Sequence, residues 1–487
     1  MSADDAYKIA LVSNRGPVSF VQRDSGFELR RGAGGLAGAL DPVAARLHDR
    51  AVWIAAAISE GDRAAVAAGE VSSLREELGY PVRMLDIDPE MYARYYDVVS
   101  NRMLWFANHC LWDELEIREF GPKEIAAWND SYLPVNERFA EEVADLGDPS
   151  WLVLFQDYHL AMAPRFLRAR NPEQTIFHFT HSSFCGPQGL GRLPDPMARD
   201  VIAGMLGADL VGFHVTPWVE GFADACRMIG ADVDDEGVVT YEGRRSWIRE
   251  YPIPIDAPEL RRRAGDDAAS RWAEKFLGHS DGPLIVRADR MEPSKNIIRG
   301  FEAFGRLLDR RRDLRDARFI ACLYPSRQSM PEYQRYAQGI EAAVEAVNER
   351  HPGSILLFTN DDFDRTLGAL RVYDVLLVNP IMDGMNLVAK EGSALNERDG
   401  VLILSSGAGA FEELGAGSIT IDDALDIDAT AVAIEEALAM NLDERRKRAE
   451  SLREIVESRT PAMWIEAQLT DLQRVRDGVA PTTPYRS

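Results

Sequence analysis

Positive charge is scarce in this sequence of 487 residues, in which 55 Lys and Arg stand against 79 Asp and Glu, a formal net charge of −24 at pH 7. This balance disfavours nonspecific nucleic-acid binding, because contacts with backbone phosphates need clustered Lys and Arg. No run of about 18 apolar residues is present, so we expect no membrane span. The acidic start, MSADDAYKIALVSN, lacks the basic residues of a signal peptide. We therefore predict a cytoplasmic protein that binds neither nucleic acid nor membrane.

Cysteine is also sparse. The four cysteines lie far apart and form no CxxC pair: Cys110, Cys185, Cys226 and Cys322. This spacing argues against a zinc site and against a disulfide framework. No compact group of carboxylates accompanies the histidines, so we predict no metal and no other cofactor. Ser182 and Ser183 lack the spacing of a nucleophile elbow, which disfavours a serine hydrolase.

The sequence instead contains short aliphatic or β-branched runs separated by amphipathic segments of helical length. Such continuous apolar strands between helices are typical of a parallel sheet covered on both faces. The runs lie at residues 9–12, 151–155, 175–179, 210–213, 284–287, 318–323, 355–358, 375–378 and 401–404. Their number favours two sheets, so we predict an α/β protein.

The expected domain boundary is the segment 251–256, YPIPID, because its two prolines disfavour a continuing helix. We predict an N-terminal domain of residues 1–255, a C-terminal domain of residues 256–455 and a last segment of residues 456–487. In that last segment, residues 461–475 form an amphipathic helix and the rest frays. We also expect one helix over 257–278, and a hairpin or mobile loop over the polar residues 22–32.

Candidate phosphate contacts are local. The glycine-rich stretch 32–38 precedes a predicted helix and would let a phosphate approach backbone N–H groups, although close helix packing explains it equally well. After the strand at 284–287, Arg290 and Lys295 would project from a strand-to-helix loop. A surface ion pair with Asp289 or Glu292 is the alternative. We favour phosphate binding, because two cations here supply a positive field that the acidic chain otherwise lacks.

Residues 380–392, PIMDGMNLVAKEG, follow another predicted strand and turn through Gly384 into a helix. Backbone N–H groups at the start of this helix would face a phosphate or a sugar, and Glu391 would accept from ribose hydroxyls. The alternative is that Asp383 caps the helix and Glu391 is solvated. Asp157 and His181 each follow a predicted strand, where open α/β sheets bind ligands, although either could instead cap a turn.

Together these motifs resemble the trehalose-6-phosphate synthase family. The resemblance is carried by SNRGPV at 13–18, GGL at 34–36, SNRMLW at 100–105, DYHL at 157–160, GFH at 212–214, Arg290 with Lys295, DGMNLVAKE at 383–391 and SGAGA at 406–410. It runs from about residue 7 to residue 475. It implies a GT-B fold, in which two Rossmann-like domains face a cleft and a C-terminal helix crosses back to the N-terminal domain. It also implies a metal-independent, retaining transfer from a nucleotide-activated ring to a phosphorylated acceptor.

The resemblance further implies a role for each site residue. Arg290 and Lys295 would stabilise the departing diphosphate, and Asp157 and His181 would line the junction of donor and acceptor. The implied donor and nucleotide residues, mostly in the C-terminal domain, are Gly34, Gly35, Asp383, Gly384, Met385, Asn386, Leu387, Val388 and Glu391. The implied acceptor residues, mostly in the N-terminal domain, are Arg15, Tyr96, Trp105, Asp157 and Arg327.

Several segments depart from the family pattern. HSSFC at 181–185 replaces His-Ile-Pro-Phe-Pro, EPSKN at 292–296 replaces Asp-Tyr-x-Lys-Gly, WIAA at 53–56 replaces a tryptophan-glycine-tryptophan element, and SSGA at 405–408 is also altered. This combination resembles the pseudo-glycosyltransferase branch. That resemblance implies C–N coupling of GDP-valienol to validamine 7-phosphate with retention, giving validoxylamine 7′-phosphate and GDP in validamycin-type antibiotic biosynthesis.

Two other interpretations stay open. One is a trehalose-6-phosphate synthase or a related retaining sugar-phosphate glycosyltransferase, and the other is a catalytically silent sugar-phosphate sensor. In each case the expected partners are small molecules: a nucleotide-activated donor and a phosphorylated acceptor. The sequence leaves open both the nucleotide base and a homo-oligomeric state.

Overall fold

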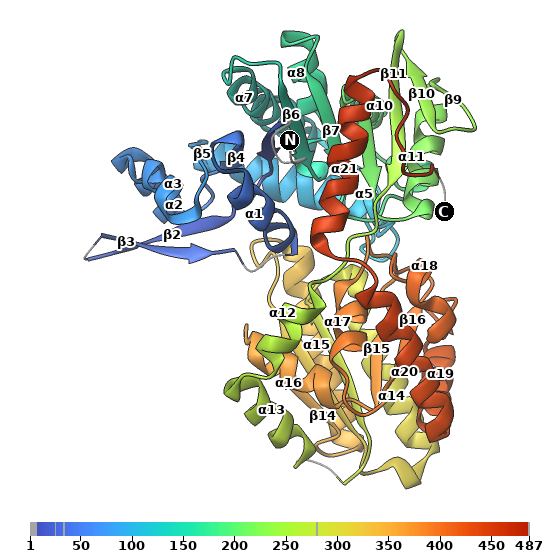
Figure 1. Ribbon diagram of the computed structural model, residues 1–487. Coiled ribbons are helices and arrows are strands. Elements are labelled where there is room, and N and C mark those ends of the chain that lie inside the picture. The colour runs from blue at the N-terminus through green and yellow to red at the C-terminus, as the bar shows by residue number, and fades with distance from the viewer. Residues whose placement is uncertain (1–6, 25, 33–34, 279–280, 486–487) are drawn as a thin grey trace. The chain divides into compact units, whose positions relative to one another are not determined.

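The computed structural model describes residues 7–24, 26–32, 35–278 and 281–485. The chain forms two compact units, each with its own sheet and its own core (Figure 1). The N-terminal unit comprises Met1–Pro252 together with Pro461–Ser487, and the C-terminal unit comprises Ile253–Thr460.

The N-terminal unit is built on a sheet with the described strands in the order β5-β4-β1-β6-β7-β8-β11-β10-β9. Strands β5 to β11 of this order are parallel, and β10 and β9 add an antiparallel edge. The bounds are β1 Lys8–Val12, β4 Ala51–Ala56, β5 Val82–Leu85, β6 Trp151–Gln156, β7 Thr175–Phe179, β8 Leu210–Phe213, β9 Asp232–Val233, β10 Val238–Tyr241 and β11 Arg244–Glu250. The central strands are buried apolar runs, as a doubly covered parallel sheet requires.

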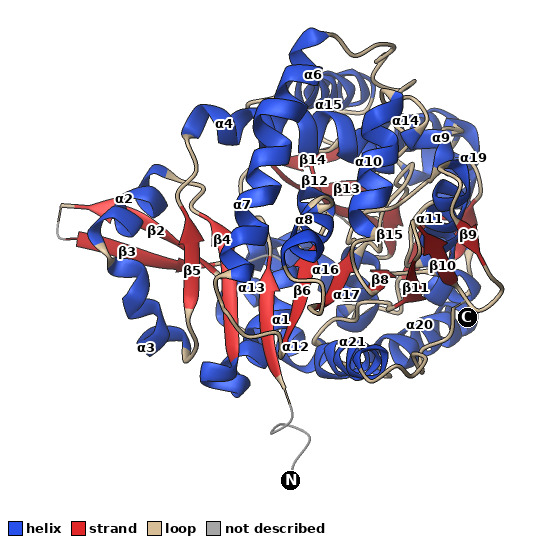
Figure 2. Ribbon diagram, turned by 90° about the horizontal axis from the view of Figure 1, so that it is seen from above, coloured by secondary structure: helices blue, strands red, loops and turns tan. Residues whose placement is uncertain are grey.

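Helices cover this sheet on both sides, as Figure 2 shows for α7 and α21 beside β4 and β6. Their bounds are α1 Gly35–Leu47, α2 Glu60–Ala68, α3 Leu74–Leu78, α4 Pro89–Ala93, α5 Phe106–Asn108, α6 Pro122–Ala127, α7 Leu133–Ala144, α8 Ala163–Arg170, α9 Pro187–Leu190, α10 Asp195–Met205, α11 Thr216–Met228 and α21 Pro461–Arg476. Two π-helical segments, Arg94–Trp105 and Trp128–Tyr132, lie between α4 and α7.

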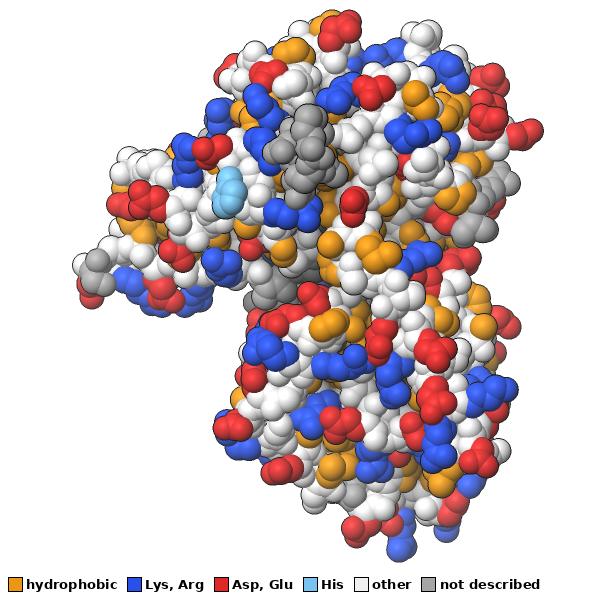
Figure 3. Space-filling model, viewed as in Figure 1, with side chains coloured by type: hydrophobic (Ala, Val, Ile, Leu, Met, Phe, Trp, Pro, Cys, Tyr) orange, Lys and Arg blue, Asp and Glu red, His pale blue; other side chains and the backbone are white. Residues whose placement is uncertain are grey.

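Residues 18–31 form a hairpin, which confirms the first of the two expectations for this segment. β2 (Val18–Arg23) pairs antiparallel with β3 (Gly26–Arg31). The hairpin is fastened to α2, because the backbone N–H of Phe20 donates to Asp62 Oδ1 at 2.7 Å. A Cβ on Gly61 would lie 2.2 Å from the Phe20 carbonyl oxygen, so only glycine permits this close approach. Acidic and basic side chains are interspersed along the hairpin at the left of Figure 3.

The C-terminal unit contains a sheet whose described strands are all parallel, in the order β14-β13-β12-β15-β16-β17. The strand bounds are β12 Leu284–Arg290, β13 Arg318–Tyr324, β14 Ile355–Phe358, β15 Val375–Val378, β16 Val401–Ser405 and β17 Ile419–Ile421. The helix bounds are α12 Ala257–Ala264, α13 Asp267–Leu277, α14 Ile297–Arg310, α15 Pro331–Arg350, α16 Phe363–Val372, α17 Leu387–Leu395, α18 Phe411–Leu414, α19 Ile427–Ala439 and α20 Leu442–Glu457.

The predicted strands are confirmed, but some elements differ from expectation. The single helix expected over 257–278 is two helices, because α12 ends at Ala264 and a new helix starts after Asp266, whose backbone is extended. β4 was missed because half of its residues are alanine, a strong helix former that is depleted in strands. The WIAA element therefore lies in a buried strand, where Trp53 Nε1 donates to Ser13 Oγ at 2.8 Å.

The last helix, α21, belongs to the N-terminal unit and packs against α1, β6 and β7 (Figure 1, red). Tyr251 binds it twice: its carbonyl accepts from Trp464 Nε1, and its hydroxyl donates to Asp471 Oδ2, both at 2.9 Å. Asp471 Oδ1 in turn accepts from the backbone N–H and the hydroxyl of Thr482. Tyr485 is buried, so the expectation of a frayed end is wrong as far as this residue.

Within the described ranges, no helix is both long and apolar enough to cross a membrane.

Candidate active site

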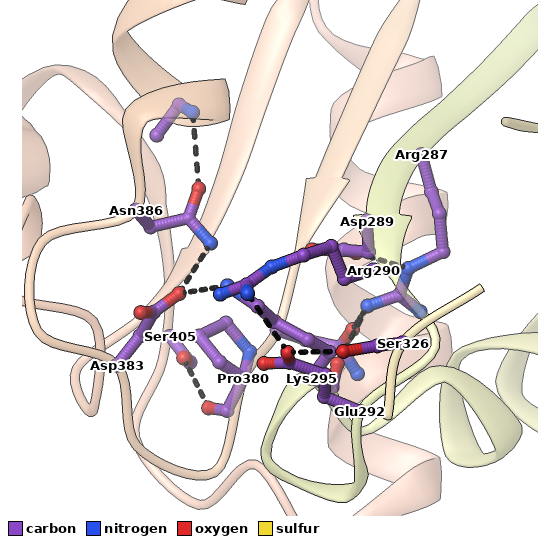
Figure 4. A network of polar contacts seen from close by, with 12 residues as sticks. Arg287, Asp289, Arg290, Glu292, Lys295, Ser326, Pro380, Asp383, Asn386 and Ser405 are labelled. Carbon is purple, nitrogen blue, oxygen red and sulfur yellow. Dashed lines mark hydrogen bonds and ion pairs between the residues drawn. The ribbon is translucent and has the colours of Figure 1, made fainter. Parts of the chain in front are cut away.

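A network of polar side chains lies where β12 ends in the C-terminal unit (Figure 4). β12 finishes at Arg290, a 3₁₀ turn covers Pro293–Lys295, and α14 begins at Ile297. The loops after β13 and β15 lie at the same edge, because the carboxyl ends of parallel strands meet there. These three loops bring together Arg290, Lys295, Arg327 and Asp383.

Lys295 forms an ion pair with Asp383. Its ammonium contacts Asp383 Oδ2, which also accepts from Asn386 Nδ2 at 2.9 Å. Burial disfavours the ammonium, but the carboxylates of Asp383, Asp289 and Glu292 outweigh it and raise the pKa of Lys295. Lys295 is therefore a mostly covered cation, and a covered cation acts on a phosphate more strongly than one in water.

Arg290 and Arg327 share a second carboxylate, that of Glu292. Their Nη1 atoms lie 3.1 and 2.9 Å from its Oε1, to which Ser326 Oγ also donates at 2.9 Å. Burial alone would raise the pKa of Glu292, but the charges of Arg290, Arg327 and Lys295 lower it to about 2. The ion pair weighed as the alternative for Arg290 is therefore present. The Arg290 side chain is still 53% exposed, so its fork of N–H donors remains accessible to a phosphate.

A buried pair beneath this loop, Arg287 and Asp289, was missed by the sequence reasoning. Arg287 Nε donates to Asp289 Oδ2, and its Nη2 donates to the Lys295 carbonyl and to Asn379 Oδ1, each at 2.8 Å. Burial raises the pKa of Asp289 despite the neighbouring guanidinium. The pair ties the backbone of Lys295 to the end of β15. Its signal in the sequence is a pair of charges inside an otherwise apolar strand.

Asn386 shapes the turn from β15 into α17. Its φ is 73°, which a non-glycine residue rarely adopts, and its Oδ1 accepts from the Ala389 N–H at 3.2 Å. Asn386 rather than Asp383 is therefore the cap, and the capping alternative for Asp383 is wrong. The first N–H groups of a helix have no partner inside it, so they can meet an anion or a hydroxyl. The predicted donor residues of this turn are Gly384, Met385, Asn386, Leu387 and Val388.

The glycines of the loop after β16, which contains the SSGA segment, are required by close packing. A Cβ on Gly407 would lie 2.1 Å from the Ile381 carbonyl oxygen, and one on Gly409 would lie 2.1 Å from that of Gly384. These glycines let the loop after β16 lie directly against the turn that carries Asp383, with which Ala408 forms a parallel bridge.

Glu391 lies in α17 and is not fully solvated, so the solvated alternative is wrong. Burial raises its pKa to about 7. Near neutral pH its carboxyl is therefore partly protonated and can exchange between donor and acceptor of a hydrogen bond.

In the N-terminal unit, Asp157 follows β6 and has a φ of 71°. Its backbone N–H donates to the Phe179 carbonyl at 2.6 Å, and its Oδ1 accepts from the His181 N–H at 3.2 Å. His159 Nδ1 lies 3.8 Å from its Oδ2. A polar residue in such a sparsely populated conformation at a strand end is typical of a ligand site. The structure thus brings Asp157 and His181 together, and their place at the junction of donor and acceptor stays a prediction.

His181 is a neutral imidazole. Burial lowers its pKa well below the ordinary value, and His214 and His178 lower it further. Its Nε2 lies 2.9 Å from Gln156 Oε1, an acceptor, so Nε2 carries the proton and Nδ1 can accept. The ring packs against Phe179 and Trp464. The sequence reasoning did not identify Gln156 or Trp464 as neighbours of His181. Gln156 could have been found, because it is a polar residue at the end of a buried strand.

Apart from Asp157, the acceptor residues expected in this unit lie along one π-helical segment and the loop after β1. Tyr96 stacks on His159 with ring centroids 5.6 Å apart. Trp105 is only 6% exposed and packs on Tyr158, so most of its ring is covered by other side chains. Arg15 is exposed and lies near Tyr92. Burial raises the pKa of the Tyr92 hydroxyl, and the charge of Arg15 offsets part of this rise. Arg327 belongs to the C-terminal unit.

The sequence argument against disulfides is wrong, because Cys110 and Cys185 are bonded to each other. The bond joins the loop after α5 to the HSSFC segment, which Asn108 also holds: its Nδ2 donates to Ser182 Oγ at 2.9 Å. The pairing was invisible because 75 residues separate the two cysteines and only the fold brings them together. Cys226 and Cys322 are free and buried.

Two predictions are still to be considered: donor binding by Gly34 and Gly35, and the absence of a metal site. Gly34 lies outside the described residues, and Gly35 is the first residue of α1. Among the residues that the structure describes, no three His, Cys, Asp or Glu side chains are grouped so that they could hold a metal ion. Metal independence therefore stays a prediction.

Known proteins resemble this chain along nearly its whole length. The sequence profile of glycosyltransferase family 20 matches residues 7–474. The trehalose-6-phosphate synthase of Mycolicibacterium vanbaalenii is 31% identical over 481 residues, covering 95% of each chain. An α,α-trehalose-phosphate synthase (UDP-forming) from Burkholderia vietnamiensis superposes with a TM-score of 0.82 at 26% identity, covering 97% of this chain and 98% of the other. A second, from Burkholderia xenovorans in complex with glucose-6-phosphate, gives 0.79 at 26% identity, covering 96% and 100%.

These matches show an α/β fold of the GT-B type. All three relatives are described as trehalose-phosphate synthases, so the finer resemblance to the pseudo-glycosyltransferase branch stays a prediction. The coarser resemblance is confirmed along nearly the whole sequence. The chain therefore belongs to glycosyltransferase family 20 and is a transferase.

Proposed function

We propose that the protein transfers a glycosyl group, with retention, from a nucleotide sugar to a sugar phosphate, as a trehalose-6-phosphate synthase does. The observation that carries this proposal is the cluster of Arg290, Lys295, Asp383 and Arg327 at the carboxyl end of the C-terminal sheet. The cluster would serve a diphosphate leaving group on either donor, and the similarity to a trehalose-6-phosphate synthase over 95% of the chain favours the glycosyl donor over the carbocyclic alternative.

In the proposed reaction, the bond between the ring carbon and the diphosphate breaks and leaves an oxocarbenium-like ring. Arg290 and Lys295 stabilise the negative charge that develops on the departing diphosphate, the electrostatic role that metals play elsewhere. The acceptor hydroxyl attacks the same face of the ring, and its proton passes to a phosphate oxygen. No protein nucleophile is needed.

The remaining residues bind and orient. Asp383 and the first turn of α17 hold the donor ring, and Glu391 accepts from the nucleotide ribose. Asp157 and the neutral His181 contact the reacting sugars, with His181 Nδ1 available to accept from a hydroxyl. Arg15, Tyr96, Trp105 and Arg327 are the proposed residues for the acceptor and its phosphate.

A second candidate is the coupling of GDP-valienol with validamine 7-phosphate. It is favoured by the altered segments at 181–185 and 292–296, of which the first is tethered here through Cys185 and Cys110. An allylic cation would replace the oxocarbenium ion, and an amine would replace the hydroxyl. The third interpretation, a silent sensor, is disfavoured because a sensor needs no pair of cations to stabilise a leaving group.

The experiment is a donor and acceptor panel. UDP-glucose, GDP-glucose and GDP-valienol are each incubated with glucose 6-phosphate and with validamine 7-phosphate, and the products are identified by mass spectrometry. We expect glucosyl transfer to glucose 6-phosphate. A C–N product from the carbocyclic pair, without glucosyl transfer, would establish the second candidate. Ligand binding with no product from any pair would establish the sensor.

A further inference from the structure

Glu292 joins two arginines for which the family resemblance implies different roles. Arg290 and Arg327 both approach its Oε1, with Nη1 at 3.1 and 2.9 Å. The Glu292 side chain is 0% exposed and that of Arg327 is 7% exposed, whereas that of Arg290 is 53% exposed. One buried anion therefore holds a guanidinium inside the fold and a second guanidinium at the surface.

The geometry is not the one expected of a pair built for stability alone. Three donors converge on Oε1, while Oε2 is buried without a hydrogen-bond partner among the described residues. A purely structural carboxylate would use both oxygens, as in a bidentate pair with one arginine. Sharing one oxygen brings the two Nη1 atoms within about 6 Å, and such like charges repel unless an anion lies between them.

We propose that Glu292 is a positioning residue that fixes Arg290 and Arg327 relative to each other. One anchor then holds both the proposed stabiliser of the departing diphosphate and the proposed ligand of the acceptor phosphate. This inference rests on the proposed function. Glu292 itself touches neither substrate and acts through the two guanidiniums.

The first test separates turnover from anion binding. Glu292→Gln keeps the size of the side chain and removes its charge, so we expect kcat to fall about 10- to 100-fold. Inorganic pyrophosphate, measured by calorimetry, should bind this variant at least as tightly as the parent, because a negative charge near the cations is gone. A fold that is merely loosened would lose both properties together, and that result would overturn the proposal.

Asp374→Asn is the matched control. Asp374 is a nearly buried carboxylate of the same unit, and its Oδ1 also pairs with two arginines, Arg398 and Arg445, at 3.2 and 3.3 Å. It precedes β15 and so lies at the opposite end of the sheet from Glu292. We expect the kcat of this variant to stay within about 3-fold of the parent, even where it loses stability, because Arg398 and Arg445 are not among the proposed site residues.

The second test is a double-mutant cycle. In a protein that already carries Arg290→Ala and Arg327→Ala, Glu292→Gln should lower kcat by less than about 3-fold, because no guanidinium is left to position. An undiminished loss in that background would overturn the proposal. Glu292→Asp keeps the charge and should recover part of the turnover, and it serves as the test variant if Glu292→Gln does not fold.

Failure of the proposed function can be recognised separately. A parent protein that turns over no donor–acceptor pair would overturn the transfer reaction. The positioning role is then decided by pyrophosphate alone: Arg290→Ala must weaken its binding more in the parent than in the Glu292→Gln variant. Equal weakening in both would overturn the positioning role.

Discussion

Arg290 and Lys295 meet different carboxylates, Glu292 and Asp383, within one loop of the C-terminal unit. Both cations are therefore held in place by carboxylates, which restrict the conformations of the two side chains before substrate binds. This preorganisation is the property that makes charged groups effective on a developing negative charge.

Replacing either cation tests this role. We expect Arg290→Ala or Lys295→Ala to lower kcat by about 10²–10³-fold, the scale for losing one preorganised donor to an anionic transition state. The measurement is steady-state turnover with the active donor and acceptor, alongside a thermal unfolding curve. Arg306→Ala and Lys447→Ala, on exposed faces of α14 and α20, are matched controls. Near-parent turnover in both site variants, with the fold intact, would contradict the assignment.

Glu391 gives a prediction for pH. Its pKa is about 7 in the folded protein, above the ordinary 4.5 of a glutamate, because burial disfavours the carboxylate. Between these values the folded state binds more protons than the unfolded state, so this group makes stability fall as pH rises from about 4.5 through 7. Glu391→Gln removes the titration. The variant should therefore gain stability relative to the parent at pH 8 compared with pH 5.

Urea unfolding at pH 5, 6.5 and 8 measures this difference. A constant gap between variant and parent across the three pH values would mean that Glu391 is not held in a desolvated site. Glu397→Gln, at an exposed ion pair in the same unit, controls for the loss of one charge.

Sequence reasoning reached the charged residues at strand ends, and it named Glu292 as a possible partner of Arg290, but it did not reach the partners on other loops. Asp383 and Asn386 are both good capping residue types, and only the positive φ of Asn386 decides which of them caps α17. Likewise, nothing local in the sequence shows that Glu292 will meet Arg327, which lies 35 residues away on another loop. Long-range pairing is set by sheet topology, which single motifs do not encode.

At the scale of elements, the disulfide joins the loop after α5 to the HSSFC segment across 75 residues. Closing a loop of this length removes conformational freedom from the unfolded chain and stabilises the fold by about 4–5 kcal/mol. We expect a Cys110→Ser/Cys185→Ser double variant to lose stability of that order in guanidinium unfolding.

A reducing agent provides the control for the same bond. It should destabilise the parent by a similar amount and leave the double variant unchanged, since the two remaining cysteines are free in either case. A parent whose unfolding curve is identical with and without reductant would show that the bond adds no stability.

The elements that could be predicted were those with a strong local pattern. Aliphatic runs such as β6 and β12 are read directly from the sequence, whereas alanine-rich β4 resembles a helix until its neighbours cover it. The π-helical segment Arg94–Trp105 could not be predicted from periodicity, because π-helical turns are rare and their wider spacing differs from the 3.6-residue period of an α-helix. The residues it carries, including Tyr96 and Trp105, were found only through the family resemblance.

At the scale of the whole molecule, a protein with a net charge of −24 is proposed to act on phosphorylated substrates. Its positive field is therefore local. In the proposed reaction, the cations at the end of β12 stabilise the charge on the departing diphosphate, which a metal ion does in other enzymes. We expect activity to survive exhaustive chelation of enzyme and substrates. Activity that disappears with chelator and returns with magnesium or manganese would contradict this expectation and reassign the leaving-group role.

The return of α21 to the N-terminal unit means that the C-terminal unit is an insertion in the middle of the other. During synthesis, the ribosome must therefore add roughly 200 residues between Pro252 and Pro461, which takes about 10–40 s. Throughout that interval Phe179 and His181 lack the indole of Trp464 that covers them in the finished protein. The unit that starts first is thus completed last, and its apolar surface is meanwhile open to chaperones.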